Sequence, residues 1–243
     1  MNGELLFVVT SHAALGSSGN PSGLWLEELA APYWILRDAG MEPIIASPKG
    51  GEAPIDPMSL EERWMSDAGR RFMSDPEAVA RLRHTVPLDE LVSSSFAGIY
   101  LVGGTAATFD FPGNLALNKL VLGHFANASV VAGICHGVIG LADATDEAGE
   151  PIVKGRQITC ISDAEDIMMG VEKVVPVLPE QMMRKLRAIY SAAPPLAPHV
   201  VCDPPFFTGQ NPASAEPLGQ QILKYLNRRS AEHGSRDKTA ICD

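Results

Sequence analysis

The chain has 243 residues, of which 46% are hydrophobic and 20% are charged, with 19 basic and 29 acidic side chains. This length fits one large domain or two small ones with a full core, and the hydrophobic content excludes a mostly disordered chain. The formal net charge of −10 argues against nucleic acid as a main partner, because binding phosphates requires Lys and Arg.

The cysteines indicate a reducing compartment. They are far apart and have no metal-like spacing, so we expect reduced thiols and no metal site: Cys135, Cys160, Cys202 and Cys242. No apolar run reaches the roughly 18 residues of a membrane helix. The N-terminal Met-Asn-Gly-Glu leads directly into a strand-like run rather than a signal peptide. The sequence therefore predicts a soluble cytoplasmic protein that does not act at a membrane.

Short apolar runs alternate with longer helical patterns along most of the chain. In chain order we expect a strand over 5–10, a helix over 24–38, strands over 43–47 and 98–102, a helix over 114–127, a strand over 129–134, a helix from His136, a hairpin over 151–159 around Lys154-Gly155, a helix over 179–190, short strands over 200–201 and 206–208, and a helix over 213–226. This alternation predicts a single α/β domain over residues 1–230, with a mostly parallel sheet and helices on both faces.

Two segments do not follow this alternation of strands and helices. Residues 48–95 are rich in Pro, Gly, Asp and Glu, with helical pieces near 59–72 and 75–84. We interpret them as a small insertion that covers the sheet edge or forms a cap. Residues 228–243 are polar and show no periodicity, so we expect a tail that is loose or docks on the body or a partner subunit.

The most informative motif is Ala132-Gly-Ile-Cys-His-Gly137, which follows an apolar run and opens a helix. This is the context of a nucleophile elbow, in which glycines relieve crowding around a strained residue. A helix N-terminus would lower the pKa of the Cys135 thiol and favour the thiolate. The alternatives are a buried structural cysteine for Cys135 and a helix-capping role for His136, whose orientation adjacency alone does not determine.

The first expected helix carries an unusual carboxylate. Glu28 shares its helical stripe with Leu24, Ala31 and Ile35, and this stripe is expected to be buried. A buried carboxyl group has a raised pKa and can serve as a proton donor. The alternative is a solvated residue of the first turn that interacts favourably with the helix dipole.

Further candidates lie near the ends of other expected elements. The Gly103-Gly104-Thr105 turn ends a strand, and its backbone N–H groups could bind an oxyanion or a substrate carbonyl. The acids of Ser162–Ile167 are either helix-capping residues or the partner that orients His136 in a Cys–His–acid arrangement. His12 and Asn211-Pro212 are further candidates for lining a pocket, although a structural role is favoured for each.

Several of these motifs together resemble the ThiJ/PfpI superfamily. They are GICHG after a strand, LVGG one strand earlier, the glutamate of GLWLEELAAP, the ASPKGG and PIDPMS segments, and TGQNPAS near the end. The resemblance spans about residues 4–227 and is closest to the branch of glutathione-independent glyoxalases (glyoxalase III) and stress chaperones. It implies a class I glutamine-amidotransferase-like fold, which is a flavodoxin-like sandwich.

By this resemblance, the nucleophile falls on Cys135, its histidine on His136, and the buried glutamate that hydrogen-bonds the thiol on Glu28. The acidic member of the triad falls on Asp166, with Glu165 one register away. Substrate or oxyanion binding is assigned to Gly103, Gly104, Thr105, Glu165 and Asn211. Family members often read GGHG where this chain has Gly103-Gly104-Thr105-Ala106, so any role of that histidine is absent or supplied elsewhere.

The function that the resemblance implies is a cofactor-free lyase that converts methylglyoxal or a similar 2-oxoaldehyde into a 2-hydroxy acid. A homodimer is expected because it is the commonest oligomer. The same residues also suit a Cys-dependent amidase, peptidase or deglycase. A third possibility is a redox sensor or a holding chaperone that uses apolar surface near Trp64, Met65 and Phe72.

Overall fold

A seven-stranded sheet forms the centre of the protein. The computed structural model describes residues 4–239, with side chains as far as residue 231. The strand order is β3-β2-β1-β4-β5-β9-β8, and all neighbours are parallel except β8 and β9. The strands are β1 (Glu4–Val8), β2 (Glu42–Ser47), β3 (Val86–Pro87), β4 (Gly98–Leu101), β5 (Val130–Ile134), β8 (Val200–Asp203) and β9 (Phe206–Gly209). A separate parallel pair joins β6 (Gln157–Ile158) to β7 (Ile189–Tyr190).

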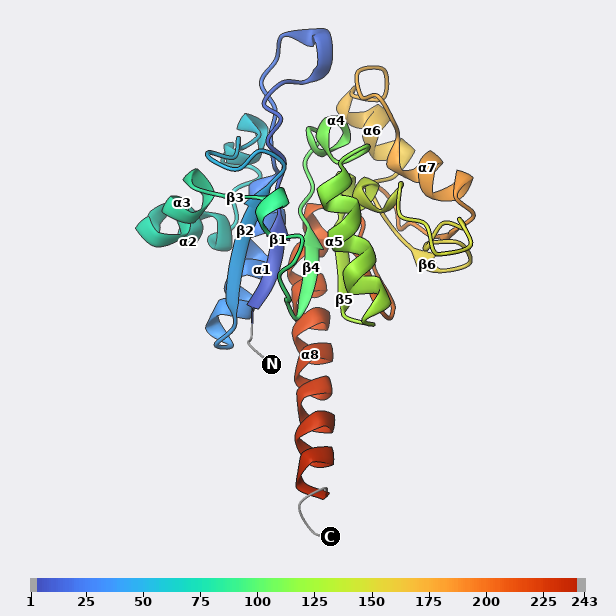
Figure 1. Ribbon diagram of the computed structural model, residues 1–243. Helices are drawn as coiled ribbons and strands as arrows, with labels where there is room; N and C mark the ends of the chain where they lie inside the picture. Colours follow the sequence, from blue (N-terminus) through green and yellow to red (C-terminus); the bar gives the residue numbers. More distant parts are fainter. Residues whose placement is uncertain (1–3, 240–243) are drawn as a thin grey trace.

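Helices cover both faces of the sheet (Figure 1). One face carries α1 (Leu26–Asp38), α2 (Asp67–Ser74), α3 (Pro76–Arg83) and α8 (Ala215–Thr239), and the other carries α5 (Leu115–Ala126) and α7 (Pro179–Lys185). The short helices α4 (Ala107–Asp110) and α6 (Asp163–Met169) lie towards the carboxyl ends of the strands. Short 3-10 helices are η1 (Gly16–Ser18), η2 (Pro57–Leu60), η3 (Leu88–Glu90), η4 (Cys135–Leu141) and η5 (Pro212–Ser214). The predicted flavodoxin-like α/β sandwich is confirmed.

The strands are buried on both faces, which explains why the sequence locates them. In β1, Leu5 and Phe7 pack into the core under α1 and α8, while Leu6 and Val8 pack into the core under α5. A parallel strand covered on both sides must be apolar at successive positions rather than at alternate ones. Within the described residues, no helix is both long and apolar enough to cross a membrane.

Three expected elements differ from the structure. Residues 151–159 do not form a hairpin: Gly155 turns the chain with φ of 71°, but β6 then pairs with the distant β7. The helix expected over 179–190 ends at Lys185, because Ile189–Tyr190 is this partner strand. These errors share a cause, since a local turn signal does not specify a long-range strand partner.

The third difference is the end of the chain. The sequence predicts a helix that stops at Leu226 and a polar tail without periodicity, but α8 continues to Thr239. Figure 1 shows this helix projecting past the sheet at the end where the strands begin. Helix formers such as Arg and Ala sustain a helix without an apolar stripe, so the absence of periodicity was not a stop signal. The rest of the expected tail, residues 240–243, lies outside the described residues.

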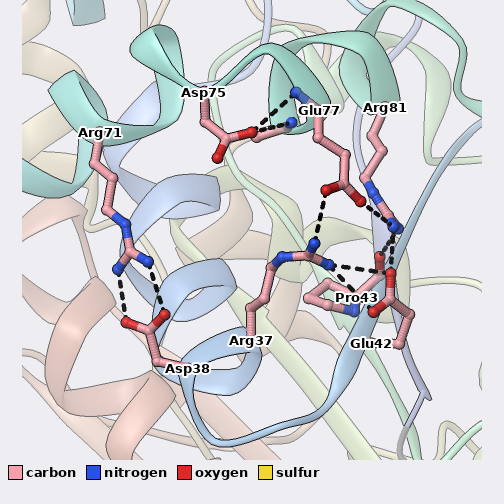
Figure 2. Close-up of polar contacts among 9 residues, drawn as sticks. Arg37, Asp38, Glu42, Pro43, Arg71, Asp75, Glu77 and Arg81 are labelled. Atoms are coloured by element: carbon pink, nitrogen blue, oxygen red, sulfur yellow. Dashed lines mark hydrogen bonds and ion pairs between the residues drawn. The ribbon is translucent and has the colours of Figure 1, made fainter.

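The inserted segment 48–95 is attached to the body by charged and apolar contacts. Figure 2 shows Arg37 of α1 between Glu42 of β2 and Glu77 of α3, at 3.1 and 2.9 Å, with Arg81 bonded to the same two carboxylates. Beneath these exposed pairs, the fully buried Phe72 packs edge-on against Tyr33 of α1, with ring centroids 5.1 Å apart. The segment also supplies the edge strand β3, so it is part of the sheet as well as a cover.

We expect the apolar contact to dominate this attachment. Phe72→Ala should lower the free energy of unfolding by about 3–5 kcal/mol, because it leaves a cavity among aromatic rings. Arg37→Ala should lower it by about 1 kcal/mol or less, because solvent screens exposed ion pairs. Urea denaturation of both variants measures the difference. An equal loss in the two variants would mean that the charge network, rather than the packing, holds the segment.

Candidate active site

Cys135 lies where the central strand β5 turns into η4, and its φ is 54°. A positive φ is strained for a residue with a side chain, and such strain is concentrated at functional sites. Gly137 permits the sharp turn, because a Cβ at this position would lie 2.4 Å from the carbonyl oxygen of Leu101. The predicted strand-to-helix turn is present, but the helix is 3-10 from Cys135 to Leu141 rather than α-helical from His136.

The Cys135 thiol, His136 and Asp166 form a chain of hydrogen-bonding groups. The Cys135 Sγ lies 3.3 Å from His136 Nδ1, and His136 Nε2 lies 2.8 Å from Asp166 Oδ1. Both side chains of the His–Asp pair are almost fully buried. Because the Asp166 carboxylate accepts a hydrogen bond from the Nε2–H of His136, the ring carries its proton on Nε2, and Nδ1 can accept the thiol proton. The adjacent histidine thus faces the sulfur, and Asp166 rather than Glu165 is its partner.

Glu28, on the first turn of α1, also lies next to the thiol. Its carboxyl group is fully buried, and neither oxygen has a hydrogen bond of ordinary geometry within the described residues. Gly103 makes room for it, because a Cβ there would lie 2.2 Å from Glu28 Oε2 and 2.8 Å from Cys135 Cβ. Tyr100 donates a hydrogen bond of 3.0 Å to the Glu28 backbone carbonyl and so ties this turn to β4.

Burial determines whether Glu28 and Cys135 carry protons. It raises the pKa of Glu28 from 4.5 to about 8, against the opposing influence of the neighbouring Cys135 thiol. Glu28 is therefore mainly protonated at neutral pH and can donate a hydrogen bond. Burial, with the nearby carboxylates Glu28 and Glu165, also raises the pKa of Cys135. The expected lowering by a helix dipole is wrong, because desolvation outweighs the short 3-10 turn that follows the cysteine.

Glu165 and Asn211 line the pocket together with Pro212, as predicted, but the polar atoms of Glu165 and Asn211 are already occupied. The Glu165 carboxylate accepts hydrogen bonds from the Ser162 N–H and hydroxyl, the Leu196 N–H, the Gln210 amide and the Asn211 amide, at 2.7–3.1 Å. Asn211 also donates to Ala197 and accepts from Ser214. These donors lower the pKa of Glu165 despite its burial. Both residues thus join α6, the 191–198 loop and η5 below the pocket, rather than offering free groups to a substrate.

The pocket above Cys135 is small, with a volume of about 30 Å³. Gly104, Thr105, Cys135 and His136 form its reactive wall. Its apolar walls were not predicted from the sequence: Trp25, Trp64, Ile161, Met169 and Leu196. Trp64 comes from the inserted segment, so the only available signal was an aromatic residue in a polar stretch. His12 does not line this pocket and instead stacks on Phe109.

Metal binding finds no support in the described part of the chain, where no group of three or more His, Cys, Asp or Glu side chains is placed to hold an ion. The described cysteines Cys135, Cys160 and Cys202 are all free. Cys242 lies outside the described residues.

The fold and the position of Cys135 define a class of proteins: α/β sandwiches with a buried cysteine at the end of a central parallel strand. The chain belongs to the DJ-1/PfpI family, whose model matches residues 23–225. This membership agrees with the resemblance found in the sequence motifs.

Named relatives extend over nearly the whole chain. The glutathione-independent glyoxalase hsp3101 of Schizosaccharomyces pombe is 27% identical over 91% of this chain and 95% of its own length. The glutathione-independent glyoxalase HSP31 of Saccharomyces cerevisiae is 25% identical over 92% and 98%. The structure of the 24 kDa rapid encystment protein of Francisella tularensis is 32% identical, with a TM-score of 0.88 over 92% and 98%. Glyoxalase III of Candida albicans shares the fold, with a TM-score of 0.84 over 91% and 96% at 23% identity.

The buried Glu28 should make stability depend on pH. The unfolded chain releases this proton near pH 4.5 and the folded protein near pH 8, so raising the pH between these values favours unfolding. The cost is absent below pH 4.5 and reaches roughly 5 kcal/mol above pH 8. The free energy of unfolding of Glu28→Gln, measured by denaturation at several pH values, should therefore rise relative to the wild type over this window. Parallel pH profiles for the two proteins would contradict the raised pKa.

Glu165 should act as a structural anchor. In Glu165→Gln, an amide group replaces one acceptor oxygen and leaves at least one buried donor without a partner, which should cost about 1–3 kcal/mol of unfolding free energy. Asp163→Asn, on the same turn of α6, is the matched control and should cost about 1 kcal/mol or less. Thermal and chemical unfolding measure both. Equal stability of Glu165→Gln and the wild type would show that the Glu165 hydrogen bonds contribute nothing.

Proposed function

We propose that this protein is a glutathione-independent glyoxalase, which converts methylglyoxal or a similar 2-oxoaldehyde into a 2-hydroxy acid without a cofactor. The observation that carries the proposal is that Cys135 lies next to both a base and an acid: His136 Nδ1 is 3.3 Å from the sulfur, and the proton-bearing carboxyl group of Glu28 is buried beside it. Names of relatives that cover more than nine-tenths of the chain support the same reaction.

The first step is addition of the thiol to the aldehyde. Because burial raises the pKa of Cys135, the thiolate forms only as His136 Nδ1 takes the proton across 3.3 Å. The sulfur attacks the aldehyde carbon, and Glu28 protonates the aldehyde oxygen. The proton held by His136 then passes through the new hydroxyl group to the Glu28 carboxylate, so that His136 is neutral and Glu28 protonated again. The net result is addition of S–H across the carbonyl, which gives a hemithioacetal. Backbone N–H groups of Gly104 and His136 stabilise the oxyanion as it forms.

The second step moves a proton within the substrate. His136, held by Asp166, removes the hydrogen from C1, and an enediol forms while Glu28 hydrogen-bonds the oxygen. Protonation at C2 yields a 2-hydroxyacyl thioester on Cys135. Water then hydrolyses this thioester, which releases lactate from methylglyoxal and restores the thiol.

Three substitutions separate these roles. Cys135→Ala should abolish lactate formation, because no covalent adduct can form. Glu28→Gln should lower kcat/KM about 10²–10⁴-fold, because the amide cannot donate a proton and return it. Asp166→Asn should also lower kcat/KM, because it no longer fixes the ring nitrogens of His136. The measurement is lactate production from methylglyoxal without glutathione, and wild-type activity in Cys135→Ala would refute the mechanism.

A Cys-dependent hydrolase or deglycase is the second candidate, and the Cys135–His136–Asp166 line favours it. Trapping of an acyl-enzyme by a chloromethyl ketone, with loss in Asp166→Ala, would support this reading. The holding-chaperone alternative has less support, because Phe72 of its proposed apolar surface is fully buried and Trp64 lines the pocket.

We further propose that the enzyme acts in the cytoplasm as a homodimer. Free thiols at Cys135, Cys160 and Cys202 support a reducing compartment. A twofold assembly is the commonest form of soluble oligomer. Sedimentation of the purified chain would test the dimer.

A further inference from the structure

A second cavity continues outward from the pocket above Cys135. Its volume is about 260 Å³, against about 30 Å³ for the inner pocket. The two share Trp25, Thr105 and Met169 as walls, so they adjoin at these residues, with the inner pocket as the narrow end. The inner end admits only the reacting carbonyl end of a molecule. Any longer substituent must therefore pass Thr105 and lie in this outer pocket.

Thr105 stands at the junction and is available to a ligand. Its side chain is 7% exposed, and its hydroxyl makes no hydrogen bond to the described part of the chain. Its backbone carbonyl instead accepts from Thr108 at 2.7 Å, which fixes the turn that presents the side chain. This hydroxyl is not among the fully buried polar atoms without a partner, so it faces open space, where a group from outside the protein can supply the hydrogen bond. A polar group of the substrate at the junction would do so.

The polar lining of the outer pocket accepts hydrogen bonds and carries negative charge. Asp56 takes one hydrogen bond at each oxygen, from the Met58 N–H at 2.9 Å and from the Ser22 hydroxyl at 3.0 Å. Glu61 is paired with Arg63 through one oxygen at 2.8 Å. Each carboxylate keeps free lone pairs, because a carboxylate has about four acceptor positions. Among the described residues, the lining includes no Lys or Arg.

We propose that the enzyme takes 2-oxoaldehydes with an uncharged, hydroxylated tail, and that the tail lies in the outer pocket against Thr105, Asp56 and Glu61. This inference rests on the proposed glyoxalase function. Tail hydroxyls donate to the two carboxylates, and the apolar walls Trp25 and Met58 pack against the carbon chain. An anionic tail is rejected, because it would bring a negative charge against Asp56 and Glu61, and Arg63, which pairs with Glu61, offsets only one of these two charges.

The test compares three aldehydes on the full-length wild-type protein: methylglyoxal, 3-deoxyglucosone with its hydroxylated tail, and 4,5-dioxopentanoate with its carboxylate tail. We expect kcat/KM at least tenfold higher for 3-deoxyglucosone than for 4,5-dioxopentanoate. Met58→Trp fills the outer pocket and should lower the ratio of kcat/KM for 3-deoxyglucosone to that for methylglyoxal at least tenfold. The matched control is Met73→Trp, another partly exposed methionine that lines a separate cavity, and it should leave this ratio unchanged.

Binding separates this proposal from the proposed function. Calorimetry with Cys135→Ala reports affinity without turnover, so 3-deoxyglucosone should bind this protein more tightly than 4,5-dioxopentanoate, and Met58→Trp added to Cys135→Ala should weaken the binding. Loss of turnover with these affinities intact would overturn only the glyoxalase reaction. Methylglyoxal turnover with no preference between the two tails, or with equal effects of Met58→Trp and Met73→Trp, would overturn the outer-pocket proposal alone.

Discussion

Burial of the Glu28 carboxyl group against the Cys135 thiol is the constraint on which the rest of the site depends. Two negative charges cannot occupy this dry space together, because an isolated buried charge costs far more than the stability of a domain can offset. At least one of Glu28 and Cys135 must therefore remain protonated, and the pKa values of both groups are raised accordingly. The contact exists only because Gly103 has no side chain and Tyr100 holds the first turn of α1 in place.

Glu165 shows how surroundings decide what a buried carboxyl group does. Both glutamates are almost fully buried, yet the pKa of Glu28 is raised and that of Glu165 is lowered. Glu28 has no hydrogen bond of ordinary geometry, whereas five donors converge on Glu165. One residue is suited to carry a proton and the other to hold three segments together as a permanent anion. Such divergent environments separate chemical from structural roles within one site.

The central sheet could be predicted from the sequence because doubly buried strands are recognisable as local apolar runs. The positions of Cys135 and Glu28 were also accessible, since each breaks a local pattern: a cysteine between glycines and a carboxylate in an apolar stripe. The pairing of His136 with Asp166 was accessible only through the family resemblance, because no local pattern joins residues 30 positions apart. The β6–β7 pairing and the position of Trp64 in the pocket wall could not be predicted either, because both depend on contacts with residues far away in the sequence.

The dimensions of the pocket bear on which reaction this arrangement can perform. A Cys–His–Asp line alone fits acyl transfer as well as aldehyde chemistry, but a peptide substrate needs an open cleft on both sides of the scissile bond. Here Trp25 and Trp64 close in above the sulfur and leave about 30 Å³. An aldehyde presents its reacting carbon at the end of the molecule, so it can reach Cys135 end-on while the remainder stays outside. The inserted segment, by contributing Trp64, thus narrows the approach to Cys135, which suits the proposed reaction of a terminal carbonyl group.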